Sequence, residues 1–188
     1  MQKLSVINQQ FIKAAQNNRL NKLKNLLSQG ANIHADADYA LRWSACYGHL
    51  EIVEFLVTNG ANIHANDDAA LRYSAENGQF EVVRFLATKG ANIHAQGDYA
   101  LRYSARYCRL ETVKFLVAQG ANIHADNDSA LRWSTYNEHY DVWRVLSAFI
   151  QEEKLLVAAS DSMLVLPAVG SMLQTKQPSI TKTKRSKI

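Results

Sequence analysis

The chain has 188 residues, and 47% of them are apolar, which is enough for the buried core of one ordinary domain. The net charge of +4 is unevenly distributed: the last 22 residues carry five basic residues and no acidic one, while the residues before them carry 16 basic and 17 acidic ones. A main body without excess basic charge argues against nucleic acid as a partner. No uncharged apolar run reaches the roughly 18 residues of a membrane span.

A six-residue motif, Gly-Ala-Asn-Ile-His-Ala, recurs four times at a spacing of 30 residues, beginning at Gly30, Gly60, Gly90 and Gly120. Between its copies the pattern Ala-Leu-Arg-(Trp/Tyr)-Ser returns with the same period. Self-similarity at a fixed period of about 20–50 residues is typical of a solenoid. We therefore expect residues 1–150 to form one repeat array, with 1–29 as a polar-faced cap repeat and further repeats at 30–59, 60–89, 90–119 and 120–149.

Each period predicts two short helices joined by a tight turn. Asp38 and its equivalents at 68, 98 and 128 stand just before the first helix, where a carboxylate is expected to cap free N–H groups. Gly48 and Gly78 then predict a left-handed turn between the helices. Cys108 and Glu138 occupy the same turn position in later repeats, where a non-glycine residue costs roughly 1–2 kcal/mol.

The repeat resembles the ankyrin repeat, whose pattern includes T-P-L-H-x-A-A-x-x-G-H-x-E-V-V and a later G-A-D-V-N-A. Residues 39–53 read Y-A-L-R-W-S-A-C-Y-G-H-L-E-I-V and residues 60–65 read G-A-N-I-H-A, and the likeness extends over residues 9–149. It implies an all-α ankyrin solenoid of about five helix pairs. The function that it implies is that of a non-catalytic scaffold, expected to be monomeric, that binds a partner protein in a concave groove.

Two features depart from the family pattern. The period is 30 residues instead of about 33, so the hairpin fingers between repeats are expected to be shortened. The family's Thr-Pro-Leu-His is replaced by Tyr-Ala-Leu-Arg, so an Asp–Arg pair four residues apart, such as Asp38 with Arg42, is expected to replace the lost hydrogen bonds. This variant resembles the arrays of giant DNA viruses and some intracellular bacteria.

The resemblance also assigns candidate binding residues, since first-helix positions face the groove in this family. Tyr, Trp and Arg are enriched at binding hot spots. The protein-binding candidates are Trp43, Tyr47, Tyr73, Asn77, Tyr103, Arg106, Tyr107, Trp133 and Tyr136. An alternative is open for the aligned aromatics at 43, 73, 103 and 133, which could stack on one another and hold the curvature of the array.

Other reactive side chains do not form a recognisable site. The histidines at 34, 64, 94 and 124 recur once per repeat, too far apart to converge on one metal ion, and predict hydrogen-bonding loop residues. Cys108 has no nameable catalytic base. We expect no enzyme, cofactor, metal or small-molecule substrate. Cys46 lies two repeats from Cys108, beyond disulfide reach, which predicts a reducing, intracellular location.

The C-terminal part departs from the repeat. Apolar residues at helical spacing from Val142 to Leu156 predict that the last helix runs past residue 150 to about Ala158. A helical extension over 151–173 is expected to cover the open end of the array. Residues 174–188 predict a disordered basic tail, whose 182–187 cluster could direct nuclear import. The alternative function is a nucleic-acid- or chromatin-associated protein acting through this tail.

Overall fold

The structure, a computed structural model, describes the backbone of residues 2–164 and the side chains of residues 6–160. Regular structure in this part is entirely helical. The described helices are α1 (Gln2–Gln16), α2 (Leu20–Ser28), α3 (Ala35–Cys46), α4 (Leu50–Thr58), α5 (Ala65–Glu76), α6 (Phe80–Thr88), α7 (Ala95–Arg106), α8 (Leu110–Ala118), α9 (Ala125–Tyr136) and α10 (Tyr140–Leu164). The chain divides into a compact unit of residues 1–150 and a second unit that begins at Gln151.

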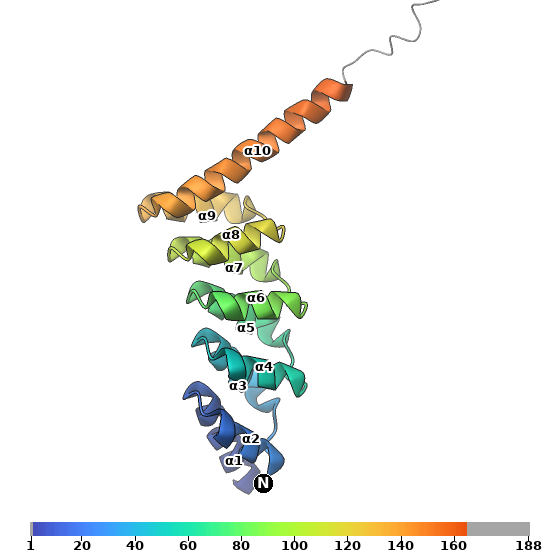
Figure 1. Ribbon diagram of the computed structural model, residues 1–188, viewed down its shortest axis with the longest axis vertical. Helices are drawn as coiled ribbons and strands as arrows, with labels where there is room; N and C mark the ends of the chain where they lie inside the picture. The colour runs from blue at the N-terminus through green and yellow to red at the C-terminus, as the bar shows by residue number, and fades with distance from the viewer. Residues whose placement is uncertain (1, 165–188) are drawn as a thin grey trace, which may run out of the picture. The chain divides into compact units, whose positions relative to one another are not determined.

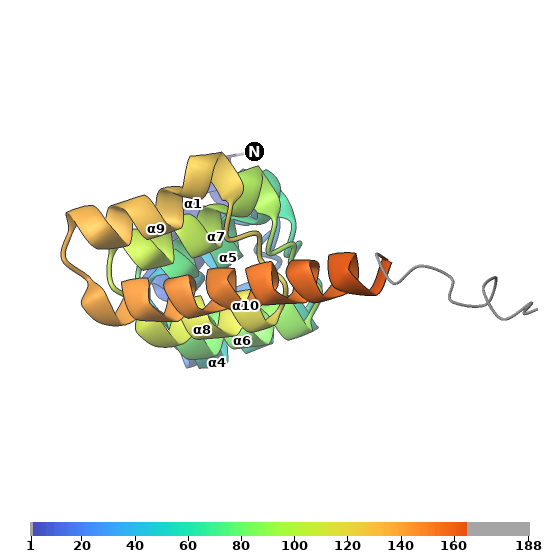
Figure 2. The same ribbon diagram turned by 90° about the horizontal axis from the view of Figure 1, so that it is seen from above.

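Within residues 1–150 the helices form two layers, and the predicted all-α solenoid is confirmed. The first-helix layer consists of α1, α3, α5, α7 and α9, each packed on the next, while α4, α6 and α8 follow one another in the second-helix layer (Figures 1 and 2). The second helices α2, α4, α6 and α8 have only nine residues each. Isolated helices this short are marginal in water, so packing between repeats must stabilise them.

The core repeats with the sequence. Leu41, Leu71 and Leu101 of the first helices are almost completely buried, as are Leu56 and Leu86 of the second. Small residues at the next first-helix positions, Ser and Ala at 44–45, 74–75 and 104–105, are also buried. Each of these serine hydroxyls donates to the carbonyl three residues earlier, as Ser74 Oγ does to Leu71 O at 2.9 Å. The hydroxyls of these three buried serines are thus satisfied within their own helix.

The start of each full first helix contains three consecutive residues in left-handed conformation. Asp36, Ala37 and Asp38 have φ of 53°, 51° and 56°, and residues 66–68, 96–98 and 126–128 repeat this left-handed turn. Such a conformation costs an ordinary L-residue roughly 1–2 kcal/mol. Asp, Asn or Gly, the residues that tolerate it best, occupy ten of the twelve positions. The connection between repeats is thus a tight turn, and the described residues contain no β-hairpin.

The arginine after each left-handed turn donates to backbone carbonyls of the turn. Arg42 Nε bonds to Ala37 O at 3.0 Å and its Nη2 to Asp36 O at 2.8 Å. Arg72 and Arg102 make the same pair of bonds. The predicted Asp–Arg pairs are therefore wrong. A left-handed turn removes these carbonyls from the helical hydrogen-bond ladder, and the guanidinium supplies the donors that they need.

The aspartate at the end of each left-handed turn binds the following repeat. Asp38 Oδ1 accepts a hydrogen bond from the backbone N–H of Asn62 at 2.8 Å. The same bond joins Asp68 to Asn92 and Asp98 to Asn122, again at 2.8 Å, and Asn8 of the cap repeat accepts from Asn32 at that distance. The expected capping of the aspartate's own helix is corrected: the acceptor satisfies an amide 24 residues further along the chain.

Each histidine of the repeated motif completes this connection. His64 is held by two contacts. Its backbone N–H donates to Asn62 Oδ1 at 2.9 Å, and its ring Nδ1 lies 2.9 Å from Asp68 Oδ1. The other three repeats show both contacts. The predicted hydrogen-bonding role of the histidines is confirmed. Asp, Asn and His thus form one chain of contacts that passes from repeat to repeat, which we call the Asp–Asn–His ladder.

The turns between first and second helices follow the prediction. Cys108 and Glu138 have φ of 57° and 59°, in the same left-handed region as Gly48 and Gly78. The residue after the turn reaches back to the preceding repeat: Arg109 Nε donates to Glu76 O at 3.1 Å, and a histidine takes this place at 49 and 139. The C-terminal ends of the first helices are therefore held by side chains of the next repeat.

The last helix continues past residue 150, as predicted, and extends through Leu164, the last residue whose backbone is described. Leu155, Leu156 and Val157 on it are more than half exposed. The covering of the array by residues 151–173 stays a prediction. Residues 165–173, and the tail at 174–188 with its expected disorder and basic cluster, lie outside the described residues.

The left-handed turn gives a prediction with an internal control. Ala37 and Gly97 occupy the same position in two repeats, and a Cβ added to Gly97 would meet no atom within 4 Å. Alanine and glycine at this position should therefore differ in their effect on the free energy of unfolding only through backbone strain. We expect Ala37→Gly to raise the free energy of unfolding by about 1 kcal/mol and Gly97→Ala to lower it by a similar amount. Urea denaturation would measure both, and changes of equal sign would contradict the turn geometry.

Asp68 should respond to glycine in the opposite way, although its φ is also positive. Asp68→Gly relieves the backbone but removes the acceptor for Asn92 and the contact with His64. Hydrogen bonds to charged groups contribute about 1.5–3 kcal/mol, so we expect a net loss of about 1 kcal/mol or more. Asp68→Asn keeps an acceptor, as Asn8 does, and should cost less. A stabilising Asp68→Gly in the same denaturation experiment would show that the ladder contributes little.

Cys108 offers a third test. Its left-handed conformation is strained for a residue with a side chain, and the residue is exposed. Cys108→Gly should raise the free energy of unfolding by about 1 kcal/mol. Gly78→Ala is the matched opposite change and should cost more than strain alone, because an added Cβ would lie 2.6 Å from Arg109 Cδ. An unchanged denaturation midpoint for Cys108→Gly would contradict this account of the turn.

Candidate protein-binding surface

The candidate binding residues lie on the first-helix layer, at or just after the C-terminal halves of α3, α5, α7 and α9. Tyr47, Tyr107 and Tyr136 are 51%, 42% and 86% exposed. Asn77 and Arg106 are exposed too, whereas Trp43, Tyr73, Tyr103 and Trp133 are half-buried. Residues four apart on a helix share a face, so each half-buried ring lies next to an exposed position of the same helix. The structure groups six of the nine candidates into two separate clusters, to which Tyr73, Asn77 and Tyr136 do not belong.

The N-terminal cluster runs along α3 to the residue just after it. Tyr39, Trp43 and Tyr47 form a row in which ring centroids are 5.6 Å and 5.3 Å apart. The guanidinium of Arg42 lies 5.0 Å from the Tyr39 ring centroid. Tyr39 was not among the predicted residues, although its spacing of four from Trp43 could have revealed it.

The C-terminal cluster joins α7 to α9. Tyr99 and Tyr103 stack with centroids 3.9 Å apart and planes 10° from parallel. Tyr103 also meets Trp133 of the next repeat edge-on at 5.2 Å, and Tyr107 at 6.4 Å. Tyr99 is a second member that the sequence interpretation missed. An edge-on ring pair such as Tyr103 with Trp133 adds about 0.5–1.5 kcal/mol beyond the area that it buries.

The alternative role of the aligned aromatics, stacking from repeat to repeat, is seen at one of the junctions in the described residues. Tyr103 and Trp133 are the successive pair in ring contact. Between Tyr73 and the next repeat lies the buried guanidinium of Arg72, 5.3 Å from the Tyr73 centroid and 5.1 Å from that of Tyr99. An arginine therefore links the rings where direct stacking was expected.

Glu76 sets the electrostatics between the two clusters. The hydroxyl of Tyr99 donates to Glu76 Oε2 at 2.8 Å, and burial together with this carboxylate raises the pKa of Tyr99. Burial, and secondly the charge of Glu76, also raises the pKa of the Cys46 thiol. The thiolate is the nucleophilic form of cysteine, so both effects make Cys46 less reactive. Asn77 donates to Tyr73 O at 2.9 Å and to Cys46 Sγ at 3.3 Å, which gives this candidate a structural use.

Arg106 lies at the centre of the C-terminal cluster. Its guanidinium carbon is 5.2 Å from the Trp133 ring centroid, 5.5 Å from that of Tyr107 and 5.6 Å from that of Tyr103. Each distance is within the range of about 6 Å for a cation–π interaction. Four of the predicted residues are thus brought together here, while Trp43 and Tyr47 belong to the other cluster.

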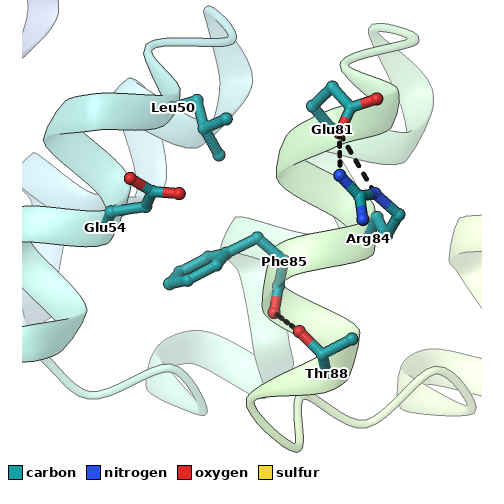
Figure 3. Close-up of a pocket in the computed structure, with 6 residues that line it drawn as sticks. All are labelled: Leu50, Glu54, Glu81, Arg84, Phe85 and Thr88. Atoms are coloured by element: carbon teal, nitrogen blue, oxygen red, sulfur yellow. Dashed lines mark hydrogen bonds and ion pairs between the residues drawn. The ribbon is translucent and has the colours of Figure 1, made fainter.

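The opposite layer carries a small pocket of about 230 Å³ between α4 and α6. Figure 3 shows that Leu50 and Glu54 face Phe85 across it, while Arg84 is bound to Glu81 of its own helix. Thr88 Oγ1 donates to Phe85 O at 2.7 Å, so most polar groups of the lining are already paired. Small-molecule sites usually enclose about 300–1,000 Å³, so this pocket is smaller, whereas the open hollow lined by Phe80, Cys108 and Arg109 reaches about 460 Å³.

The described residues form neither a metal-binding cluster nor a membrane-spanning helix. Within residues 2–164 no group of three or more His, Cys, Asp or Glu side chains is arranged to hold a metal ion. The helices described there include none that is long and apolar enough to cross a membrane.

Comparison with known families agrees with the helix pairs. A model described as ankyrin repeats (3 copies) matches residues 11–97, and an ankyrin repeat model matches residues 96–128. The chain belongs to the ankyrin-repeat family. Ankyrin repeats are generally protein–protein interaction modules. The comparison with curated proteins gave no match. The matches end before most of α9 and α10, which the structure nevertheless builds as a further helix pair.

Proposed function

We propose that this ankyrin array is a non-catalytic scaffold that binds a partner protein in a groove lined by its first helices. The general role of the family supports a protein partner. The observation that carries the proposal is the cluster of Arg106, Tyr107, Tyr103 and Trp133, which combines exposed and half-buried residues of the types that dominate binding hot spots.

Variation between repeats supports the same surface. The core and the Asp–Asn–His ladder are nearly identical in successive repeats, whereas positions 46–47, 76–77, 106–107 and 136–137 read Cys-Tyr, Glu-Asn, Arg-Tyr and Tyr-Asn. Residues that stacking does not constrain are free to encode partner choice. Positions 106 and 107 lie at the end of α7, which packs between α5 and α9 in the first-helix layer, so a bound partner could cover them from both sides. The free cysteines, Cys46 and Cys108, support a reducing compartment for this binding.

The competing proposal is association with nucleic acid through the basic C-terminal segment. It is supported by the five basic residues among the last 22, against the near-neutral remainder. A chain shortened to end at residue 174 distinguishes the two proposals. If the shortened chain no longer binds, and binding by the full chain depends steeply on salt, nucleic acid is favoured. If the shortened chain still binds, the first-helix surface is favoured.

The proposal predicts the effect of removing the central anchors. Replacing both Arg106 and Tyr107 by alanine should weaken binding to a partner protein captured by the wild-type chain at least ~30-fold. Truncation of one hot-spot residue costs about 2 kcal/mol or more. The free energy of unfolding should fall by only about 1–2 kcal/mol, because both side chains are exposed and the cation–π contacts that are lost contribute about 0.5–1 kcal/mol each at such sites. Isothermal titration calorimetry and urea denaturation measure the two quantities.

A matched control removes another exposed pair. Glu111→Ala with Lys114→Ala deletes an ion pair on α8, in the second-helix layer, and should leave affinity unchanged. If the Arg106/Tyr107 variant is folded and still binds with full affinity, the first-helix surface is not the binding site.

A further inference from the structure

Arg106 differs from the other arginines of the first-helix layer in how its N–H groups are used. Arg42, Arg72 and Arg102 each donate two hydrogen bonds to the carbonyls of their left-handed turns. Arg132 makes one such bond to Asp126 O. Within the described residues the Arg106 side chain donates no hydrogen bond and pairs with no carboxylate, although a guanidinium has five N–H donors.

The Arg106 guanidinium is nevertheless held in place. Three ring centroids lie 5.2–5.6 Å from it, on α7, on the residue after α7, and on α9. Cation–π contacts use the charge and the π-face of the rings, so they restrain the side chain without using its donors. The result is a pre-positioned, exposed cation whose N–H groups are bound by no other side chain or carbonyl among residues 6–160 and are open to solvent.

Two acidic side chains of the neighbouring helices are already engaged, while Glu138, whose neighbours Asn137 and His139 both bond to Arg106 O, forms no ion pair with Arg106 within the described residues. Glu76 accepts from the Tyr99 hydroxyl at 2.8 Å, and Asp126 Oδ2 pairs with Arg102 at 3.0 Å. The equivalents of Arg106 in the other full repeats are Cys46, Glu76 and Tyr136, so a cation stands at this position once. The surface therefore offers a single anion contact flanked by aromatic rings.

We propose that Arg106 binds a side-chain carboxylate of the partner protein, with an apolar residue beside that carboxylate packing on Tyr107 and Trp133. A guanidinium matches a planar carboxylate in a two-bond, fork-like geometry. One isolated cation is ill suited to nucleic acid, whose binding depends on several phosphate contacts. This inference rests on the proposed function, because it specifies one contact of that same surface.

The test uses the full chain and a synthetic tetraglutamate peptide with blocked ends. Because the basic C-terminal segment also attracts acidic peptides, the readout is the ¹H–¹⁵N signal of the Arg106 Nε–H group, assigned by its loss in Arg106→Lys. We expect a saturable shift of this signal with tetraglutamate, and at least ~10-fold weaker binding of the matched tetraglutamine peptide. The Arg72 signal, whose donors are used inside the protein, should move little and serves as the control.

Two results would overturn the carboxylate assignment. One is an equal shift with tetraglutamine; the other is at least ~10-fold tighter binding of a phosphoserine tetrapeptide, which would assign phosphate instead. Arg106→Lys separates this inference from the proposed function. If the lysine variant binds a captured partner as tightly as the wild type while the Arg106/Tyr107 double-alanine variant does not, the surface is correct but fork-like carboxylate recognition is wrong. We expect the lysine variant to bind at least ~5-fold more weakly.

Discussion

The bond from an aspartate carboxylate to the amide of the next repeat is the interaction on which this array depends. Asp38, Asp68 and Asp98 are nearly completely buried, and each places Oδ1 2.8 Å from an amide 24 residues later. A buried carboxylate without donors would be strongly destabilising. The left-handed turn brings this oxygen to the boundary between repeats. The backbone strain of the three turn residues is therefore linked to the hydrogen bond that the aspartate at the end of the turn accepts.

This arrangement separates stability from recognition. The Asp–Asn–His ladder and the arginines at 42, 72 and 102 act at the N-terminal starts of the first helices, where they bind backbone and one another. Residues at the opposite ends of the same helices, such as Arg106 and Tyr107, are not needed for that purpose. They differ between repeats, and the rings around Arg106 hold a cation whose donors remain free in the described structure. The proposed binding surface is the part of each repeat that the ladder leaves unconstrained.

The sequence predicted what depends on local pattern and missed what depends on distant partners. Helix pairs, the buried leucines and the turns at Cys108 and Glu138 follow from apolar spacing and from glycine at equivalent positions. The role of Asp38 could not be predicted in this way. An aspartate before a helix has the same local pattern whether it caps its own helix or accepts a hydrogen bond from an amide 24 residues away. A left-handed turn is equally hidden, since Asp and Asn also favour caps and ordinary turns. Three of the four rings of the C-terminal cluster were predicted from alignment of the repeats, whereas Tyr99 and its bond to Glu76 needed the structure.

Amide hydrogen exchange of Asn32, Asn62, Asn92 and Asn122 tests the ladder most directly. These asparagines are exposed loop residues, and their N–H groups would exchange rapidly if only water accepted from them. Because each N–H donates to a side-chain oxygen of the preceding repeat, we expect protection close to that of amides in the core helices. Exchange of all four amides at the rates of unprotected loops would contradict the central role of the Asp–Asn–His ladder.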